Sequence, residues 1–153
     1  MSSRFSLMSR YEHSLDDKGR LALPVKHREE LLKSGRPEEV VALPLETGGL
    51  VFYPHESWQA IEADLRKIID SDEREKALDF YMGNAERLSI DKSGRVLIPQ
   101  RQRLSLLREV EVRGALYKIV VSNRPLDFAV RAASFTNVRL GDINPDIIKG
   151  LPL

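Results

Sequence analysis

Apolar and polar positions alternate along the short stretch 20–23, and the matching stretch 95–98 has its arginine and two of its apolar residues at the same places; each stretch follows a polar turn that contains glycine. In the first stretch the two leucines fall on one face and Arg20 and Ala22 on the other, which is the period of a half-buried β-strand. The turn sequences DDKG and DKSG favour a tight hairpin, because aspartate can bind the turn's own amides and glycine accepts a positive φ. A proline after each strand suits the first position of a helix. The pattern therefore predicts a unit of strand, turn, strand and helix, present twice.

These two units match each other residue by residue. Segment 15–28 reads LDDKGRLALPVKHR, and segment 90–103 reads IDKSGRVLIPQRQR. The aspartate, glycine, arginine and proline coincide without a gap, as do the apolar positions between them, so that Asp16 corresponds to Asp91. Self-similarity at one fixed offset indicates a duplicated structural unit. Each copy alone is near the lower size limit for independent stability, and we therefore expect the two halves to interleave around one core.

The remaining pattern extends each unit with further strands and joins the two units through helices. It predicts strands over 38–45, 50–54, 86–90, 109–114 and 116–122, and helices over 24–35, 55–70, 71–83 and 100–107. Trp58 enters the second of these helices, and we expect it in the core or at a subunit interface. The chain thus divides into a first repeat (10–58), connecting helices (59–83), a second repeat (84–128) and a tail (129–153) without a clear period.

Composition says little about function until the charges are placed along the chain. The 24 basic and 23 acidic side chains give a net charge of +1, but both repeated segments are locally basic. Cysteine is absent, the 3 histidines lack metal-ligand spacing, and no nucleophile motif or phosphate-binding glycine loop occurs. No apolar stretch approaches the length of a membrane span. We therefore expect a protein that is not an enzyme and that has no metal, cofactor or membrane partner.

The Asp-x-x-x-Arg pair of each repeat allows two interpretations. In the structural one, the aspartate caps its turn and the arginine forms a local ion pair that contributes little to stability. In the functional one, the aspartate holds the guanidinium in a fixed pose for a phosphate, or for guanine in a major groove. The duplication and the flanking basic residues favour the second interpretation. The candidate DNA-binding residues are Asp16, Lys18, Arg20, Lys26, Arg28, Asp91, Lys92, Arg95, Arg101 and Arg103.

The basic residues around the two pairs fall into two groups. Lys18 and Lys92 lie at the predicted turn tips, where they are natural phosphate contacts. The others occupy the first turns of the predicted helices, where positive charge opposes the helix dipole but suits an anion held by the free backbone N–H groups. From the residues alone, an ordinary solvated helix face explains this second group equally well.

Together, HSLDDKGRLALPVKHREEL and LSIDKSGRVLIPQRQR closely resemble the MraZ family of bacterial transcriptional regulators, whose two halves are AbrB-like DNA-binding repeats. The segment LVFYPHESWQAIEADL is similar to the one that follows the first MraZ repeat, and the resemblance runs from residue 10 to about 122. It implies an α+β, mainly β fold: tandem AbrB-like swapped-hairpin repeats that form a pseudo-two-fold β-barrel with flanking helices. One chain then supplies both hairpins that AbrB-like proteins bring together from two chains. Beyond residue 122 the chain has Phe128 where MraZ proteins usually carry a tryptophan-containing helix.

The resemblance also implies a function. It carries a DNA-binding role to Asp16, Arg20, Asp91 and Arg95. It further implies a ring-shaped homo-oligomer that binds G-rich direct repeats of double-stranded DNA upstream of the division and cell-wall gene cluster, usually as a repressor. A cytoplasmic, nucleoid-associated protein without a small-molecule substrate is expected. Two other interpretations stay open: an antitoxin of the same fold that binds a protein partner, and a general nucleoid-associated protein.

Overall fold

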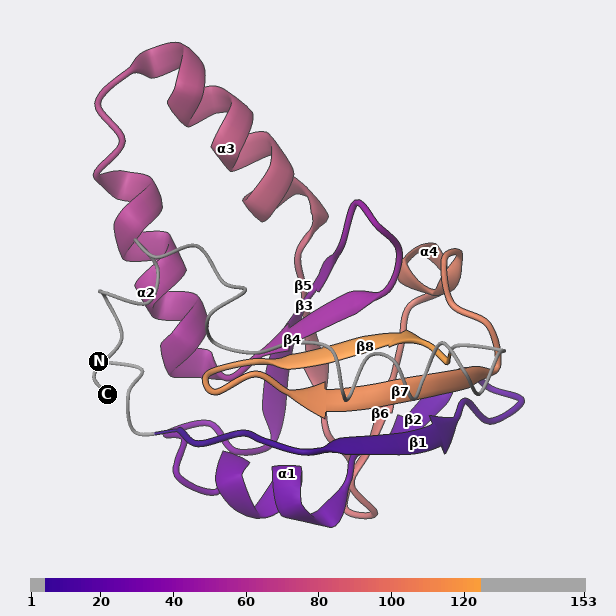
Figure 1. The fold of residues 1–153 in the computed structure, drawn as a ribbon. Coiled ribbons are helices and arrows are strands. Elements are labelled where there is room, and N and C mark those ends of the chain that lie inside the picture. Colours follow the sequence, from indigo (N-terminus) through magenta and orange to yellow (C-terminus); the bar gives the residue numbers. More distant parts are fainter. Residues whose placement is uncertain (1–4, 125–153) are drawn as a thin grey trace, which may run out of the picture.

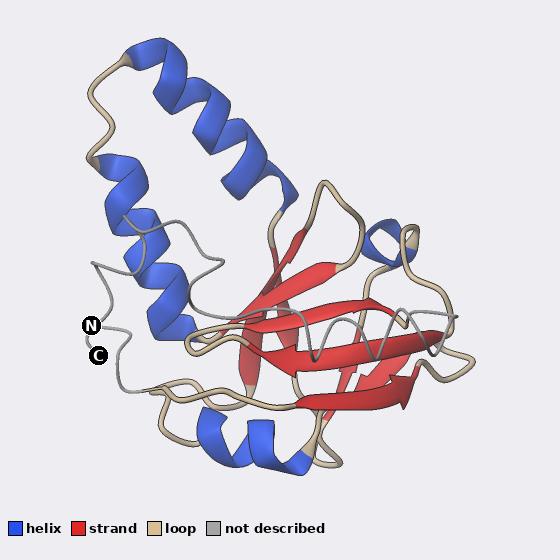
Figure 2. Ribbon diagram, viewed as in Figure 1, coloured by secondary structure: helices blue, strands red, loops and turns tan. Residues whose placement is uncertain are grey.

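The computed structural model describes residues 5–124 of the 153-residue chain (Figure 1). Its elements form a six-stranded antiparallel sheet, a separate two-stranded ribbon and four helices within that range (Figure 2). The strands are β1 (Arg10–Ser14), β2 (Arg20–Ala22), β3 (Glu39–Pro44), β4 (Leu50–Tyr53), β5 (Glu86–Ser89), β6 (Arg95–Leu97), β7 (Glu109–Gly114) and β8 (Ile119–Asn123). The helices are α1 (Val25–Leu31), α2 (His55–Arg66), α3 (Ser71–Asn84) and α4 (Gln100–Arg103). The predicted α+β, mainly β class is confirmed.

The order of strands in the large sheet shows how the two repeats interleave. It runs β1-β7-β8-β4-β3-β5. This order reads the same from either edge when each strand is exchanged for its counterpart in the other repeat: β1 with β5, β3 with β7, and β4 with β8. The first strand of each repeat therefore pairs with the third strand of the other. Interleaving of the two halves is confirmed, whereas closure of the sheets into a barrel stays a prediction.

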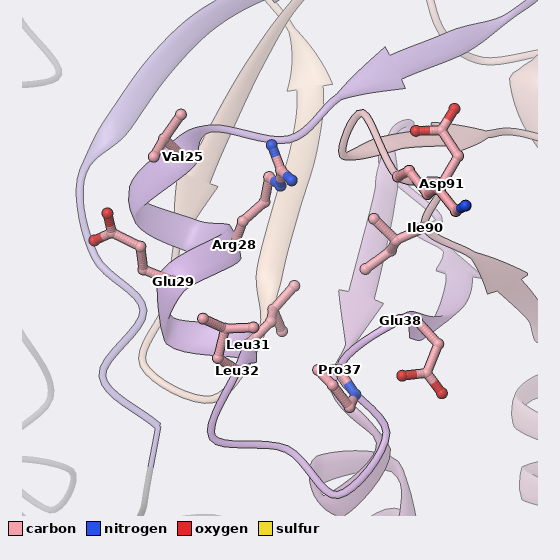
Figure 3. Close-up of a pocket in the computed structure, with 10 residues that line it drawn as sticks. Val25, Arg28, Glu29, Leu31, Leu32, Pro37, Glu38, Ile90 and Asp91 are labelled. Carbon is pink, nitrogen blue, oxygen red and sulfur yellow. The ribbon is translucent and has the colours of Figure 1, made fainter.

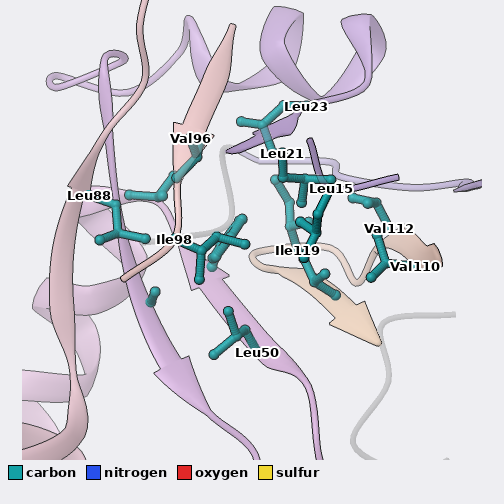
Figure 4. Close-up of a cluster of buried hydrophobic side chains, with 14 of the residues drawn as sticks. Leu15, Leu21, Leu23, Leu50, Leu88, Val96, Ile98, Val110, Val112 and Ile119 are labelled. Carbon is teal, nitrogen blue, oxygen red and sulfur yellow. The ribbon is translucent and has the colours of Figure 1, made fainter. Parts of the chain in front are cut away.

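The ribbon of β2 and β6 packs its inner face onto the large sheet. Leu21 lies directly opposite Val96 at its centre, and both side chains are fully buried. Figure 4 shows these two side chains, with Leu23 and Ile98, close to aliphatic residues of β4, β5, β7 and β8. Full burial of one such side chain contributes roughly 1.5–3 kcal/mol before conformational entropy is counted. Both repeats thus fill one core, which fixes the register of the ribbon.

Helices α2 and α3 cover part of the opposite face of the sheet, in its β3–β4 region, and then extend away from it as an arm (Figure 1). Trp58 of α2 is buried in a second apolar cluster, where its ring lies 5.7 Å from the ring of Tyr53. This confirms the core position expected for Trp58. Within residues 5–124, no helix combines the length and the apolar character that a membrane crossing requires.

Three helices end earlier than the sequence predicts. α1 stops at Leu31 instead of residue 35, α2 at Arg66 instead of residue 70, and α4 at Arg103 instead of residue 107. The apolar residues just beyond these ends, Leu32, Ile69 and Leu104, are 72%, 94% and 83% exposed, so they give the helices no buried contact that would favour extension. Backbone bonds of the i→i+3 kind replace helix after Leu31. The predicted tail, 129–153, lies outside the described residues.

Candidate nucleic-acid interface

The first repeat builds its turn around one aspartate. Oδ1 of Asp16 accepts hydrogen bonds from the backbone amides of Lys18 (2.9 Å) and Arg20 (2.8 Å), and Oδ2 accepts one from Arg20 Nε (2.6 Å). The Gly19 amide closes the turn by donating to the Asp16 carbonyl, and Gly19 has a φ of +82°, which glycine adopts without steric strain. The carboxylate therefore shapes the turn and orients the arginine at once.

The second repeat builds the same turn from the same residue types. Asp91 accepts hydrogen bonds from the backbone amides of Ser93 (2.9 Å) and Arg95 (2.8 Å) and from Arg95 Nε (3.2 Å). Gly94 has a φ of +80° and donates its amide to the Asp91 carbonyl. The local geometry that the sequence predicts for both turns is confirmed, including the capping of each turn by its aspartate.

These bonds also stabilise the ionised carboxylates. The backbone amide of Arg20 is the largest cause that lowers the pKa of Asp16, which falls from 3.8 to about 2, and the side-chain bond from the same residue adds to it. The backbone amide of Arg95 likewise lowers the pKa of Asp91. Each arginine is thus held by an aspartate that stays negatively charged throughout the neutral range.

Both arginines lie on the outer face of the same ribbon. Arg20 is opposite Leu97 and Arg95 is opposite Ala22, and opposed residues of a ribbon point to the same side. Each arginine donates a hydrogen bond from Nε to its aspartate, and its terminal nitrogens donate none within residues 5–124. A two-stranded ribbon is narrow enough to enter the major groove of B-DNA. The face therefore presents two oriented guanidinium groups in a shape that suits DNA.

The remaining candidate residues separate into exposed and half-buried ones. Lys18 and Lys92 lie exposed at the two turn tips. The side chains of Lys26 and Arg101 are 76% and 67% exposed, and each forms an ion pair with a glutamate, at 3.9 Å and 3.4 Å. All four basic groups can therefore reach a phosphate without unfolding any part of the chain.

Arg28 and Arg103 differ from the other basic candidates because they lie against the turns. A Cβ atom built on Gly94 would overlap the Arg28 guanidinium, and one built on Gly19 would overlap that of Arg103. Each arginine therefore covers the glycine of the opposite repeat. Both were predicted as phosphate contacts in the first turn of a helix, and this cross-repeat placement is not visible in the sequence pattern.

Two further residues at the interface escaped the sequence analysis. Leu97 is 56% exposed on the outer face of the ribbon, beside the arginines, where an apolar side chain can contact a thymine methyl group. The signal that could have found it is its spacing of two residues from Arg95, which puts both side chains on the same face of a strand. Arg108 pairs with Asp17 at the first turn, with 3.1 Å between Nη1 and Oδ1. That contact spans 91 positions of the sequence and has no local signal.

The described residues contain no group of three or more histidine, aspartate or glutamate side chains placed to hold a metal ion. The buried His27 illustrates why the histidines behave as structural residues. Its Nε2 lies 2.8 Å from the Met8 carbonyl oxygen, and its ring makes an edge contact with Tyr11. Burial lowers the pKa of His27, which favours the neutral ring.

Comparison with known proteins shows which family this chain belongs to. Residues 7–81 match a family model described as "MraZ protein, putative antitoxin-like". Proteins named "Transcriptional regulator MraZ" from Shewanella sp. (strain ANA-3), Shewanella baltica (strain OS155) and Shewanella putrefaciens (strain CN-32) are each 34% identical to this chain over 108 residues, which cover 69% of this chain and 71% of each relative. The matched residues include the first Asp-x-x-x-Arg turn. This chain belongs to the MraZ family.

Proposed function

We propose that the protein is a sequence-specific DNA-binding regulator of transcription that reads DNA with the outer face of the β2–β6 ribbon. One observation carries the proposal. Arg20 and Arg95 share that face, and each is oriented by an aspartate that also caps its turn. Arginine whose Nε is fixed keeps two terminal nitrogens for O6 and N7 of guanine, which is the commonest specific contact in the major groove. The names of the relatives support a role in transcription.

The flanking basic residues complete the proposed binding mode. Lys18 and Lys92 contact phosphates on either side of the groove, and Lys26 and Arg101 reach the backbone from the helices. Phosphate contacts set the position of the protein on the duplex, and base contacts provide specificity. A net charge of +1 supplies weak general attraction to DNA, so avidity from several copies in a ring-like homo-oligomer strengthens binding to repeated sites.

The target proposed for this interface is a set of G-rich direct repeats upstream of the protein's own gene, in the division and cell-wall gene cluster, with repression as the result. A guanine-rich site fits a face whose two specific donors are arginines. A nucleoid-associated place in the cytoplasm follows from this proposal. No catalytic step is part of it, and no cofactor is required.

A salt series of DNA binding tests the proposal. Affinity of the full chain is measured by fluorescence anisotropy for the upstream fragment and for the same bases scrambled. Arg20→Ala and Arg95→Ala should each reduce the preference for the upstream fragment by about 1–3 kcal/mol, which is the discrimination carried by one bidentate base contact. Lys18→Ala should weaken both complexes alike and reduce the salt slope by about 0.9.

Arg66→Ala is the matched control, because the side chain of Arg66 is 77% exposed on α2, in the helical arm. It should leave both the preference and the salt slope unchanged. If Arg20→Ala and Arg95→Ala both keep the wild-type preference while remaining folded, the ribbon face is not the reading surface. Equal, weak binding of the wild type to both fragments would instead favour a general nucleoid-associated protein.

The antitoxin alternative has one observation in its favour, which is the wording of the matching family description. It predicts a protein partner in place of a DNA site. Co-purification of a small protein in a fixed ratio, together with loss of DNA preference at the ribbon, would make it the better account. A DNA preference that depends on Arg20 and Arg95 would exclude it as the main role of this face.

A further inference from the structure

Each glycine of the two turns is held by the opposite repeat in two ways. Its carbonyl oxygen accepts a backbone hydrogen bond from just beyond the opposite ribbon strand: Ile98 N donates to Gly19 O (3.1 Å), and Leu23 N donates to Gly94 O (2.9 Å). Its Cα lies directly beneath a guanidinium of the opposite repeat, at the place where any other residue would carry a Cβ. The turn of one repeat is therefore shaped by residues of the other.

The covering arginines reach these positions from equivalent places. Arg28 lies on α1 and extends to the turn of the second repeat, where its Nη1 lies 3.5 Å from the Ser93 carbonyl oxygen. Figure 3 shows its side chain on the side of α1 that faces the loop carrying Ile90 and Asp91. Arg103 closes α4 and covers the turn of the first repeat. The two contacts are related by the same exchange of repeats that relates the strands.

These contacts do not use the charge of the guanidinium in an ion pair. Neither Arg28 nor Arg103 forms an ion pair within residues 5–124, and Nε of Arg103 is buried without a hydrogen-bond partner there. A guanidinium is planar and weakly hydrated, so it can lie against the turn, whereas the ammonium group of lysine is a compact and strongly hydrated charge. Lys26 and Arg101, two positions earlier on the same helices, remain exposed and suit phosphate contact better.

We propose that Arg28 and Arg103 are positioning residues that fix the DNA-reading turn of the opposite repeat, so that the two turns act as one coupled unit. The proposal rests on the proposed function in its DNA-binding consequence only. Arg28 sets the turn that orients Arg95, and Arg103 sets the turn that orients Arg20. We call these two arginines braces. Loss of one brace then misplaces the DNA-reading arginine of the opposite repeat, although that repeat keeps all of its own residues.

The first test uses the free protein and does not depend on DNA. Amide hydrogen exchange is measured by NMR in Arg28→Lys and Arg103→Lys, with Lys26→Gln and Arg101→Gln as controls that remove a nearby exposed charge. Arg28→Lys should speed exchange roughly tenfold at the amides of the 91–95 turn and leave the 16–20 turn unchanged, since local opening has its own free energy. Arg103→Lys should show the reverse pattern.

The crossed pattern is what distinguishes a brace from a general structural role. If each substitution instead loosens the turn of its own repeat, both turns alike, or neither turn, the proposal is wrong. The lysine variants keep the positive charge. Wild-type exchange at both of their turns would therefore mean that the positive charge alone, and not the guanidinium, holds the turn. Arg28→Gln and Arg103→Gln then repeat the measurement without the charge, and they should show the same crossed pattern at least as strongly.

The second test measures whether loss of a brace weakens the preference for specific DNA. Arg28→Lys should reduce the preference for the upstream fragment roughly tenfold while the salt slope stays within about 0.3 of the wild type, because no phosphate contact is lost. A slope reduced by about 0.9 in Arg28→Gln, with full recovery in Arg28→Lys, would identify a phosphate contact and overturn the proposal. If the wild type shows no preference for the fragment, the proposed function fails, and the crossed exchange pattern still decides whether the brace exists.

Discussion

Replacing Gly19 by alanine displaces the Arg103 side chain although Arg103 itself is not substituted. The loss of stability therefore measures how strongly Arg103 holds the turn. The new methyl group would occupy the space of the Arg103 guanidinium, so the arginine has to leave the turn. The substitution also places a β-carbon on a backbone with φ +82°, which costs an L-residue about 1–2 kcal/mol. We expect the loss of the arginine contact to add about 1 kcal/mol to that strain, within the usual range for residues in contact.

A double-mutant cycle separates the two contributions. Arg103→Ala alone loses the contact, and Gly19→Ala alone loses the contact and adds strain. The double variant loses the contact only once. The sum of the two single losses in unfolding free energy should therefore exceed the loss in the double variant by about 1 kcal/mol. Urea unfolding followed by tryptophan fluorescence gives each free energy, because Trp58 is the chain's only tryptophan and is buried in the second cluster. Protein concentration is held constant in case unfolding is coupled to subunit dissociation.

Gly48→Ala is the matched control for strain. Gly48 also has a positive φ, +94°, but an added Cβ would meet no atom within 4 Å. It should cost the left-handed strain alone, about 1–2 kcal/mol, and its effect should add to that of Arg103→Ala. A coupling between Gly19 and Arg103 below about 0.3 kcal/mol, equal to the coupling at Gly48, would refute the argument that the arginine holds the turn.

Two pH effects also follow from the site. Because the pKa of Asp16 is lowered to about 2, its stabilising contribution is present above the unfolded value near 3.8 and is lost as the pH falls from there toward 2. A carboxyl NMR titration should place Asp16 near 2, and a midpoint at 3.8 would contradict the hydrogen-bonded turn. The pKa of His27 is lowered from 6.5 by burial, so its contribution is present above 6.5 and declines as the pH falls below that value. His27→Gln places at position 27 the residue type that the second repeat has at the equivalent position, Gln102. This substitution should reduce the pH dependence of the unfolding free energy between pH 7 and 5, and an unchanged pH dependence would contradict the assignment to His27.

Local chemistry made the turns and the ribbon predictable from the sequence. Aspartate that binds amides two and four residues ahead, and glycine at a left-handed position, act within five residues of each other, so their pattern in DDKG and DKSG carries the geometry. Alternation in 20–23 likewise placed Leu21 and Leu23 on the buried face correctly. The C-terminal ends of α1, α2 and α4 were predicted too late because helix length there depends on whether Leu32, Ile69 and Leu104 find a buried partner, and all three stay exposed.

Long-range partners could not be predicted from local pattern. The alternation of β1 (Arg10–Ser14) is compatible with any neighbouring strand, and its pairing with β7 follows from the packing of both repeats into one core. The positions of Arg28 and Arg103 have the same origin, since each contacts a turn in the other half of the chain. In the sequence they look like ordinary basic residues at the start of a helix. Only the interleaved fold turns them into a pair of braces.

The backbone offers two equivalent turns, but the side chains make them unequal. The first turn carries Asp17 beside Lys18, and Arg108 pairs with that aspartate at 3.1 Å. The corresponding positions of the second turn are Lys92 and Ser93, so its tip has no acidic side chain. A phosphate near the second tip therefore meets less repulsion than one near the first. A direct repeat has no two-fold symmetry, and a pseudo-two-fold reader with identical tips would bind it equally well in both directions. Under the proposed function, the difference in tip charge is what gives one chain a preferred direction on such a site.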